Sequence, residues 1–73
     1  MENRERLALI DQLDRSFQMM PAWAQTACKH AMGAPTRFNS FRETIEASAD
    51  HTLETLRDDF ADNGDLLPAV MTQ

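Results

Sequence analysis

The sequence predicts an all-α fold: one compact three-helix domain with an apolar C-terminal tail. A chain of 73 residues supports only one hydrophobic core. Its apolar residues recur at steps of three and four, the spacing of one helical face. Helix-breaking residues at Pro21, at 33–35 and at 63–64 divide the chain into three segments and a tail. Hydrophobic residues make up 42% and charged residues 26%, which indicates a folded chain.

The first two expected helices meet at Pro21. The first helix is expected over about residues 3–19, with Asn3 as its N-cap. Its apolar face is formed by Leu7, Ile10, Leu13 and Phe17. Pro21 disfavours helical geometry at the residue before it and suits the first position of a second helix, expected over 21–32. That helix is rich in alanine, so it should pack closely, and Gly33 is a natural C-terminal cap.

The third segment, expected to be helical over 40–62, carries the clearest signals. Ser40 and Glu43 have the spacing of a capping box, in which the serine hydroxyl accepts the Glu43 backbone N–H and the Glu43 carboxylate reaches back to the Ser40 N–H. An apolar stripe then runs through Phe41, Ile45, Ala49, Leu53, Leu56 and Phe60. This spacing predicts one uninterrupted helix of about five turns, ended by Gly64.

The three helices are expected to share one core in an antiparallel arrangement. The expected core residues are Leu7, Ile10, Leu13, Phe17, Trp23, Phe41, Ile45, Leu53, Leu56 and Phe60. The tail, residues 65–73, holds several apolar side chains, and we expect it to cover one end of the bundle. A partner-binding or dimerising strip and plain disorder are the alternatives for the tail.

Five carboxylates at helical spacing in the third segment form what we call the acidic ridge: Glu43, Glu46, Asp50, Glu54 and Asp58. On a single helix they would point away from the apolar stripe. A solvated outer face is the simplest interpretation. The alternative is a docking face for a basic protein surface, because like charges four residues apart repel and few basic residues alternate with them. The net charge is −5, and residues 39–73 hold eight acidic residues against two basic ones.

Two further sets of residues are candidates for partner contacts. Arg4 and Arg6, at the start of the first helix, either serve solubility or contact an acidic partner surface or RNA phosphates. Trp23, Phe38 and Phe41 are expected near the connection between the second and third helices. They either pack in the core or line a groove that accepts a short apolar peptide.

Nothing in the sequence matches the residue patterns of catalytic or metal sites. Cys28, His30 and His51 do not supply the ligands of a structural zinc site. His51 lies near Asp50 and Glu54 but has no companion nucleophile, and no nucleotide-binding or hydrolase motif occurs. We therefore expect no metal, no cofactor and no enzymatic activity. A helix-turn-helix at the first corner would offer few polar side chains to DNA, so direct DNA binding is disfavoured.

The sequence also bears on location. Its single cysteine cannot form an intramolecular disulfide, which indicates a reducing cytosol. The first six residues alternate in charge and only a short apolar run follows, so we expect neither a signal peptide nor a targeting helix. No apolar run approaches the ~20 residues that span a bilayer. The expectation is a soluble cytoplasmic protein.

Taken whole, the 73 residues from Met1 to Gln73, helical and without a catalytic motif, resemble the short early proteins by which bacteriophages reprogramme a host. Among these, the chain resembles the antitermination proteins of Xanthomonas phages, which bind host RNA polymerase. The resemblance implies attachment near the start of the β′ subunit, close to the RNA exit path. It further implies inhibition of initiation at host promoters and suppression of pausing and hairpin-dependent termination. RNA would be contacted only within the polymerase complex.

These observations leave three hypotheses in order of preference. The first is a phage regulator that binds bacterial RNA polymerase in the host cytoplasm and acts sterically and allosterically. The second is an acidic inhibitor, an anti-CRISPR or nuclease inhibitor, that docks on a nucleic-acid-binding protein and uses the acidic ridge as a phosphate mimic. The third is a small DNA-binding repressor of the helix-turn-helix type.

Overall fold

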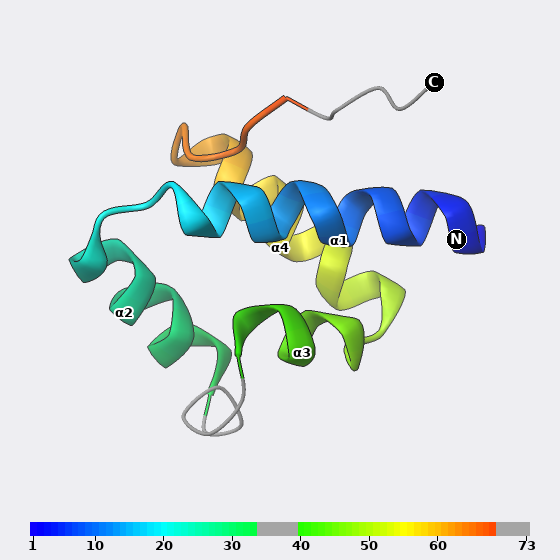
Figure 1. The fold of residues 1–73 in the computed structure, drawn as a ribbon, viewed down its shortest axis with the longest axis horizontal. Coiled ribbons are helices and arrows are strands. Elements are labelled where there is room, and N and C mark those ends of the chain that lie inside the picture. Colours follow the sequence, from blue (N-terminus) through cyan, green and yellow to red (C-terminus); the bar gives the residue numbers. More distant parts are fainter. Residues whose placement is uncertain (34–39, 69–73) are drawn as a thin grey trace.

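A computed structural model describes residues 1–33 and 40–68 of the chain (Figure 1). Within these ranges the protein forms four helices and no strand. The helices are α1 (Asn3–Gln18), α2 (Ala22–Met32), α3 (Phe41–Glu46) and α4 (Asp50–Asp62). The prediction of an all-α fold is therefore confirmed. The predicted number of helices is wrong, because the segment expected to form one helix over 40–62 forms two.

Helix α1 is the element on which the others assemble, and both α3 and α4 pack against it. Its buried side chains are Leu9, Ile10, Leu13, Ser16 and Phe17. The buried face is thus rotated relative to the predicted one: Leu9 is buried, whereas Leu7 is 50% exposed and lies outside the core. The cap position is also shifted, since Glu2 precedes the helix and Asn3 is its first residue.

The core is formed by α1, α3 and α4. Phe41 and Ile45 of α3 and Leu53 and Phe60 of α4 are at most 4% exposed and complete the cluster that α1 begins. The rings of Phe17 and Phe41 stack with centroids 4.2 Å apart, and Phe60 continues the stack at 6.2 Å from Phe41. Offset stacking of this kind adds to the stabilisation that apolar burial provides.

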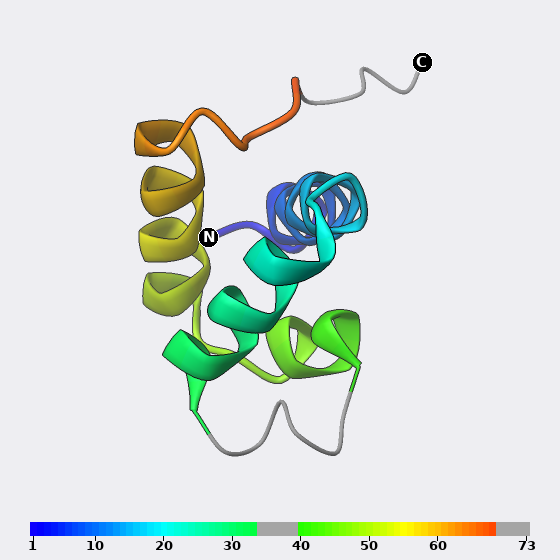
Figure 2. The same ribbon diagram turned by 90° about the vertical axis from the view of Figure 1, so that its left-hand side faces the viewer.

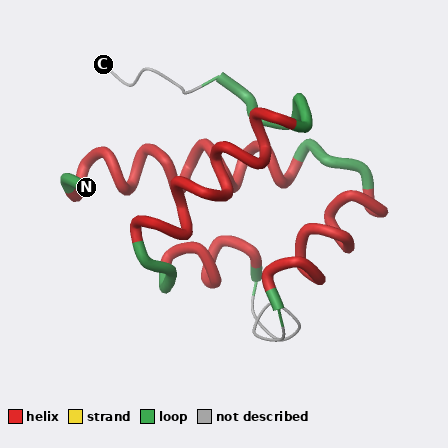
Figure 3. Tube along the Cα trace, turned by 180° about the vertical axis from the view of Figure 1, so that it is seen from behind, coloured by secondary structure: helices red, strands yellow, loops and turns green. Residues whose placement is uncertain are grey.

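The break between α3 and α4 lies at residues 47–49 and is visible from behind the molecule (Figure 3). Ser40 caps α3 as predicted, because its hydroxyl accepts the N–H of Glu43 at 3.1 Å. Ala49 has extended backbone angles, φ −69° and ψ 158°, and occupies the cap position of α4. No glycine or proline lies in this stretch, so local sequence preference does not explain the break.

Arg6 of α1 explains the break through tertiary contacts. Its guanidinium group donates hydrogen bonds to the backbone carbonyls of Glu46 and Ser48 and to the carboxylate of Asp50, the last at 2.6 Å. The carbonyls at the end of α3 lack partners within that helix, and Arg6 supplies partners for them. The bend allows the apolar faces of α3 and α4 to reach α1 along separate directions.

Helix α2 lies at one side of the molecule, below the end of α1 in Figure 1 and in front of α3 in the turned view (Figure 2). None of its residues is fully buried, and only Cys28 and Met32 pack partly against the core cluster. Pro21 is its N-cap, so the helix begins at Ala22, one residue later than predicted. Gln25 anchors the helix by donating a hydrogen bond of 2.9 Å to the carbonyl of Phe17. The alanine-rich sequence explains the weak packing, because methyl groups bury little apolar area.

After α4 the chain turns at Gly64, whose φ of 74° favours glycine. Leu66 then packs partly against the core. Leu67 is held at both backbone groups: its N–H donates to the buried Ser16 hydroxyl at 2.9 Å, and its carbonyl accepts from Gln12 at 2.8 Å. The first residues of the predicted tail therefore lie against α1. Residues 69–73 of that prediction lie outside the described residues.

Candidate protein-binding groove

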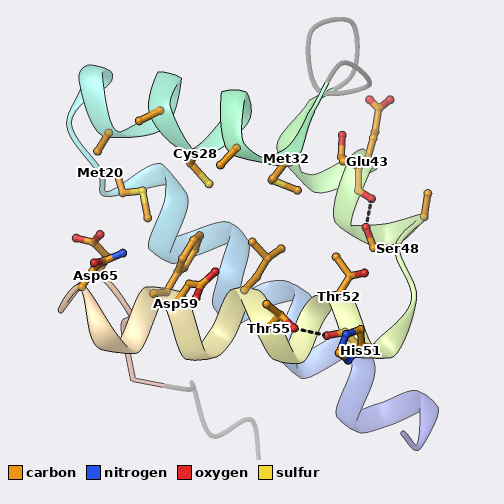
Figure 4. A pocket seen from close by; sticks show the side chains of 18 of the residues that line it. Met20, Cys28, Met32, Glu43, Ser48, His51, Thr52, Thr55, Asp59 and Asp65 are labelled. Atoms are coloured by element: carbon orange, nitrogen blue, oxygen red, sulfur yellow. Dashed lines mark hydrogen bonds between the residues drawn. The ribbon is translucent and has the colours of Figure 1, made fainter.

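The separation of α2 from the core leaves an open groove between α2 on one side and α3 and α4 on the other (Figure 4). We call this the α2 groove. Its volume is about 1230 Å³. Met20, Met32, Leu56 and Phe60 give it an apolar base, since these side chains also belong to the core cluster or pack against it.

The α2 wall of the groove consists mainly of small side chains. Ala24, Ala27 and Ala31 recur at steps of three and four, so they share one face of the helix. Trp23 adds the one large ring of this wall and is 76% exposed. Cys28 lies on the same wall and is half-buried. The wall therefore offers an apolar contact surface that is nearly flat, except where the indole ring of Trp23 protrudes.

The opposite wall, on α3 and α4, is more polar. His51, Thr52 and Thr55 line it from α4, with the Thr55 hydroxyl donating to the His51 carbonyl at 3.0 Å. Three carboxylates, Glu43, Asp59 and Asp65, stand along the groove and are what we call the rim acids. Within residues 1–33 and 40–68 no ion pair involves any of the three. The groove thus combines an apolar base with carboxylates that form no ion pair among the described residues.

Of the three aromatic residues predicted to line a groove, the structure places only Trp23 in one. Phe41 is 2% exposed and belongs to the core. Phe38 lies outside the described residues. Trp23, predicted in the core list, lies on the surface instead, because α2 does not approach α1 and α4 closely enough to cover a large ring.

The acidic ridge does not exist as one row on one helix, because the break at 47–49 separates Glu43 and Glu46 from Asp50, Glu54 and Asp58. Three of the five acids also have cationic partners. Glu46 lies 3.6 Å from Arg42, Asp50 lies 2.6 Å from Arg6, and Asp58 lies 3.6 Å from Arg57. The geometry of the predicted ridge is therefore wrong. A role for its members in binding a partner stays a prediction.

Arg4 and Arg6 have different environments. Arg4 is exposed. Arg6 is partly buried at the α3–α4 break, so its contacts within the protein occupy the group for which solubility or a partner contact was predicted. Asp50 also accepts from the Met1 ammonium group at 2.8 Å. The hydrogen bond from Met1 and, to a smaller extent, the one from Arg6 lower the pKa of the Asp50 carboxyl group. In turn, the hydrogen bond to Asp50 raises the pKa of the Met1 ammonium group.

Arg42 is a residue whose role the sequence did not indicate. It bridges α3 to α1 by pairing with Asp11 at 2.7 Å and with Asp14 at 3.4 Å. The hydrogen bond to Asp11 is the main reason that its pKa is raised. Only the fold brings these groups together, since Asp14 and Arg42 lie 28 positions apart in sequence.

Burial raises the pKa of the Cys28 thiol, with a smaller effect from Asp65, so the thiol remains protonated and a weak nucleophile at neutral pH. Asp50, the carboxylate beside His51 in sequence, is engaged by Arg6 and Met1. In the part of the chain that the structure describes, no three histidine, cysteine or acidic side chains are placed to hold a metal ion. None of the helices in that part is long and apolar enough to cross a bilayer.

The site residues thus divide into two groups. Trp23 and Glu43 line the α2 groove, whereas Arg6, Glu46, Asp50 and Asp58 form ion pairs within the protein. Arg4 and Glu54 are exposed and belong to neither group, and Phe38 lies outside the described residues. Comparison of the chain with protein-family models, with curated proteins and with solved structures found no match.

Proposed function

We propose that this protein is a phage regulator that binds bacterial RNA polymerase through the α2 groove, inhibits initiation at host promoters and acts as an antiterminator. The observation that carries the binding role is the exposed Trp23 ring on an open apolar groove. The resemblance of the whole sequence to the antitermination proteins of Xanthomonas phages is what supports polymerase as the partner. The protein would act by occupying a surface of the enzyme, without chemistry of its own.

The dimensions of the groove favour a polypeptide as its ligand. Small-molecule pockets enclose roughly 300–1,000 Å³ and bury most of their ligand. The α2 groove is larger, about 1230 Å³, and is not fully enclosed. Exposed tryptophans often dominate the energy of protein interfaces, because a large rigid ring buries much area at low entropic cost. A segment of a protein partner suits such a site.

The part of the polymerase that the similarity implies is the N-terminal region of the β′ subunit, near the RNA exit path. A groove can accept a short, accessible chain terminus of a partner more readily than it can accept a flat region of the partner's surface. A protein bound there stands close to emerging RNA, where it would oppose the formation of pause and terminator hairpins. Contact with RNA would arise only inside this complex.

The test is direct binding of the purified full chain to bacterial RNA polymerase, with two variants compared. Trp23→Ala removes the ring on the groove, and we expect its affinity to fall at least about tenfold, the effect of losing an interface hot spot. Met19→Ala is the matched control, because Met19 is 74% exposed but does not line the groove. Its affinity should stay close to that of the wild type.

Transcription with the same proteins completes the test. Wild type should reduce initiation at a host promoter and increase read-through at a hairpin terminator, and Trp23→Ala should do both less well. The absence of any complex with polymerase at low salt would refute the proposed function. Equal loss of binding in Trp23→Ala and Met19→Ala would leave polymerase as the partner but remove the groove as the contact site.

A second candidate function is an acidic inhibitor that docks on a nucleic-acid-binding protein, such as an anti-CRISPR or a nuclease inhibitor. The observation in its favour is that Glu54, Asp59 and Asp62 on α4 form no ion pair among the described residues. The broken ridge weakens it, because a phosphate mimic needs a regular row of charges. Recovery of a nuclease or surveillance complex from lysate, in place of the β and β′ subunits, would favour this candidate. A DNA complex in a mobility-shift assay would favour the repressor hypothesis instead.

A further inference from the structure

We infer that the α2 groove accepts an amphipathic α-helix of the partner that carries lysine or arginine on its polar face. The inference rests on the proposed function, because it specifies the chemistry of the segment bound at the same site. Three features of the groove carry it: the nature of its walls, its length and the charge of its rim.

The walls favour a helix over an extended segment. Between α2 and α4 the groove is lined by helices, whose backbone N–H and C=O groups are already bonded within each helix. An extended ligand would find no strand edge there and would leave its own backbone groups unpaired. A helical ligand satisfies its backbone internally and needs only side-chain contacts. Recognition would follow the helix-in-groove mode.

The length and the small side chains fit such a ligand. Helix α4 has 13 residues, which corresponds to about 20 Å, so a ligand helix of three to four turns would match it. On the other wall, Ala24, Ala27 and Ala31 allow a neighbouring helix to approach closely. Interaxial distances of about 8–10 Å are reached when the side chains at the contact are small.

The rim acids determine the charge of the ligand. Glu43 lies at the α3 end of the groove, and Asp65 lies at the opposite end, beyond α4 (Figure 4). Asp59 projects from the last turns of α4, where negative charge is also unfavourable to the helix dipole. Their carboxylates have no ion pair within the described ranges. A ligand with cations at both ends of an apolar face would neutralise them, whereas an acidic ligand would be repelled.

The experiment uses the full chain and designed peptides without tryptophan. Trp23 is the only tryptophan, so its fluorescence reports on the groove alone. Three peptides of about 14 residues, roughly four turns, are compared: one with leucines on one face and lysines on the other, one with glutamates in place of the lysines, and one with the lysine peptide's composition in scrambled order. We expect only the first to shift the emission to shorter wavelength, and its affinity should decrease with added salt.

Matched variants identify the site. Asp59→Asn with Asp65→Asn removes two rim charges and should weaken binding of the lysine peptide by about two- to fivefold per charge. Asp58→Asn with Asp62→Asn is the charge-matched control, because both are exposed acids of α4 that do not line the groove. The affinity of this control should not change. Ala27→Phe fills the groove and should abolish binding while circular dichroism shows the helices intact.

The outcomes separate this inference from the proposed function. Binding of the lysine peptide without binding of polymerase supports the inference and refutes the proposed function. Polymerase binding that is unaffected by Ala27→Phe and by the loss of both rim acids refutes the inference and removes the groove as the contact site, and leaves only polymerase as the partner. Equal binding of the glutamate peptide, or no response of Trp23 to any peptide, overturns the inference.

Discussion

The guanidinium group of Arg6 contacts three residues that lie 40 to 44 positions away from it in the sequence. It bonds the carbonyl groups of Glu46 and Ser48 and the carboxylate of Asp50, and so connects α1 to the end of α3 and the start of α4. Arginine suits this position, because its planar group carries five donors and never loses its charge in proteins. One side chain thereby supplies donors to two carbonyl groups that would have accepted backbone N–H groups in an unbroken helix.

Replacing Arg6 by alanine should therefore destabilise the whole fold. We expect Arg6→Ala to lower the free energy of unfolding by about 1–2 kcal/mol, mainly because two backbone carbonyls lose a charged donor. Urea denaturation followed by circular dichroism measures the loss. Arg4→Ala is the control, since Arg4 is exposed on the same helix, and it should cost much less. Similar losses for the two variants would contradict the role given to Arg6.

Asp50 should make stability depend on pH. Its pKa is lowered in the folded protein, first by the hydrogen bond from the Met1 ammonium group and then by that from Arg6. A carboxyl group with a lowered folded pKa stabilises the fold above its unfolded pKa, about 4, and this contribution is lost as the pH falls through the folded pKa. Wild type should thus exceed Asp50→Asn in stability near neutral pH, and the difference should vanish in acid.

The Met1 ammonium group should make the stability of the fold decrease at alkaline pH as well. Its pKa is raised, chiefly by the hydrogen bond to Asp50, so its contribution is complete below the unfolded pKa of about 8 and is lost as the pH rises through the folded pKa. Unfolding of both proteins in urea over a range of pH checks both limits. A stability difference of constant size from acid to alkaline pH would contradict the assigned contacts.

At the level of elements, the break between α3 and α4 shows how tertiary contacts override local preference. The apolar residues from Phe41 to Phe60 follow one helical face, and Ala47 and Ala49 are good helix formers. Sequence periodicity therefore predicts a single helix. The structure bends there because the carbonyls exposed by the bend are bonded by Arg6, and because the apolar faces of α3 and α4 both reach α1.

The bend at Ala49 predicts whether a serine at this position raises or lowers the free energy of unfolding. Ala49 is the N-cap of α4 and provides no side-chain hydrogen bond to the helix. Ala49→Ser supplies a hydroxyl acceptor, so it should raise the free energy of unfolding by about 1 kcal/mol. If 40–62 were one helix, the same change would place serine in a helix interior and lower it by about 0.5 kcal/mol. Urea denaturation decides between them, with Ala27→Ser in α2 as the helix-interior comparison.

At the level of the whole molecule, periodicity identified most of the core. Ile10, Leu13 and Phe17 of α1, like the four buried residues of α3 and α4, were expected there and are buried. The errors have two origins: Leu7 is exposed because the buried face of α1 includes Leu9 in its place, and Trp23 is exposed because of the position of α2. Trp23 was assigned to the core because large rings usually bury themselves, but an alanine-rich helix at the edge of a small domain does not cover it.

The candidate site was harder to predict than the fold. The sequence indicated an exposed charged face, yet most of the expected ridge is divided or paired with arginines. The groove depends on the distance between α2 and α4, which no spacing within either helix encodes. The signals that existed were the three regularly spaced alanines of α2 and the single tryptophan beside them. Their combination marks an apolar wall too shallow to fill the space that it faces.

The shallow packing of α2 has a consequence for how the protein opens. A helix of 11 residues is marginal on its own, and this one has no fully buried side chain to hold it. Its amide protons should exchange with deuterium through local fraying, whereas those of α1 and α4 wait for global unfolding. A ligand seated against α2 would slow that exchange, so isotope labelling of this one helix would reveal occupancy even when the rest of the molecule stays unchanged.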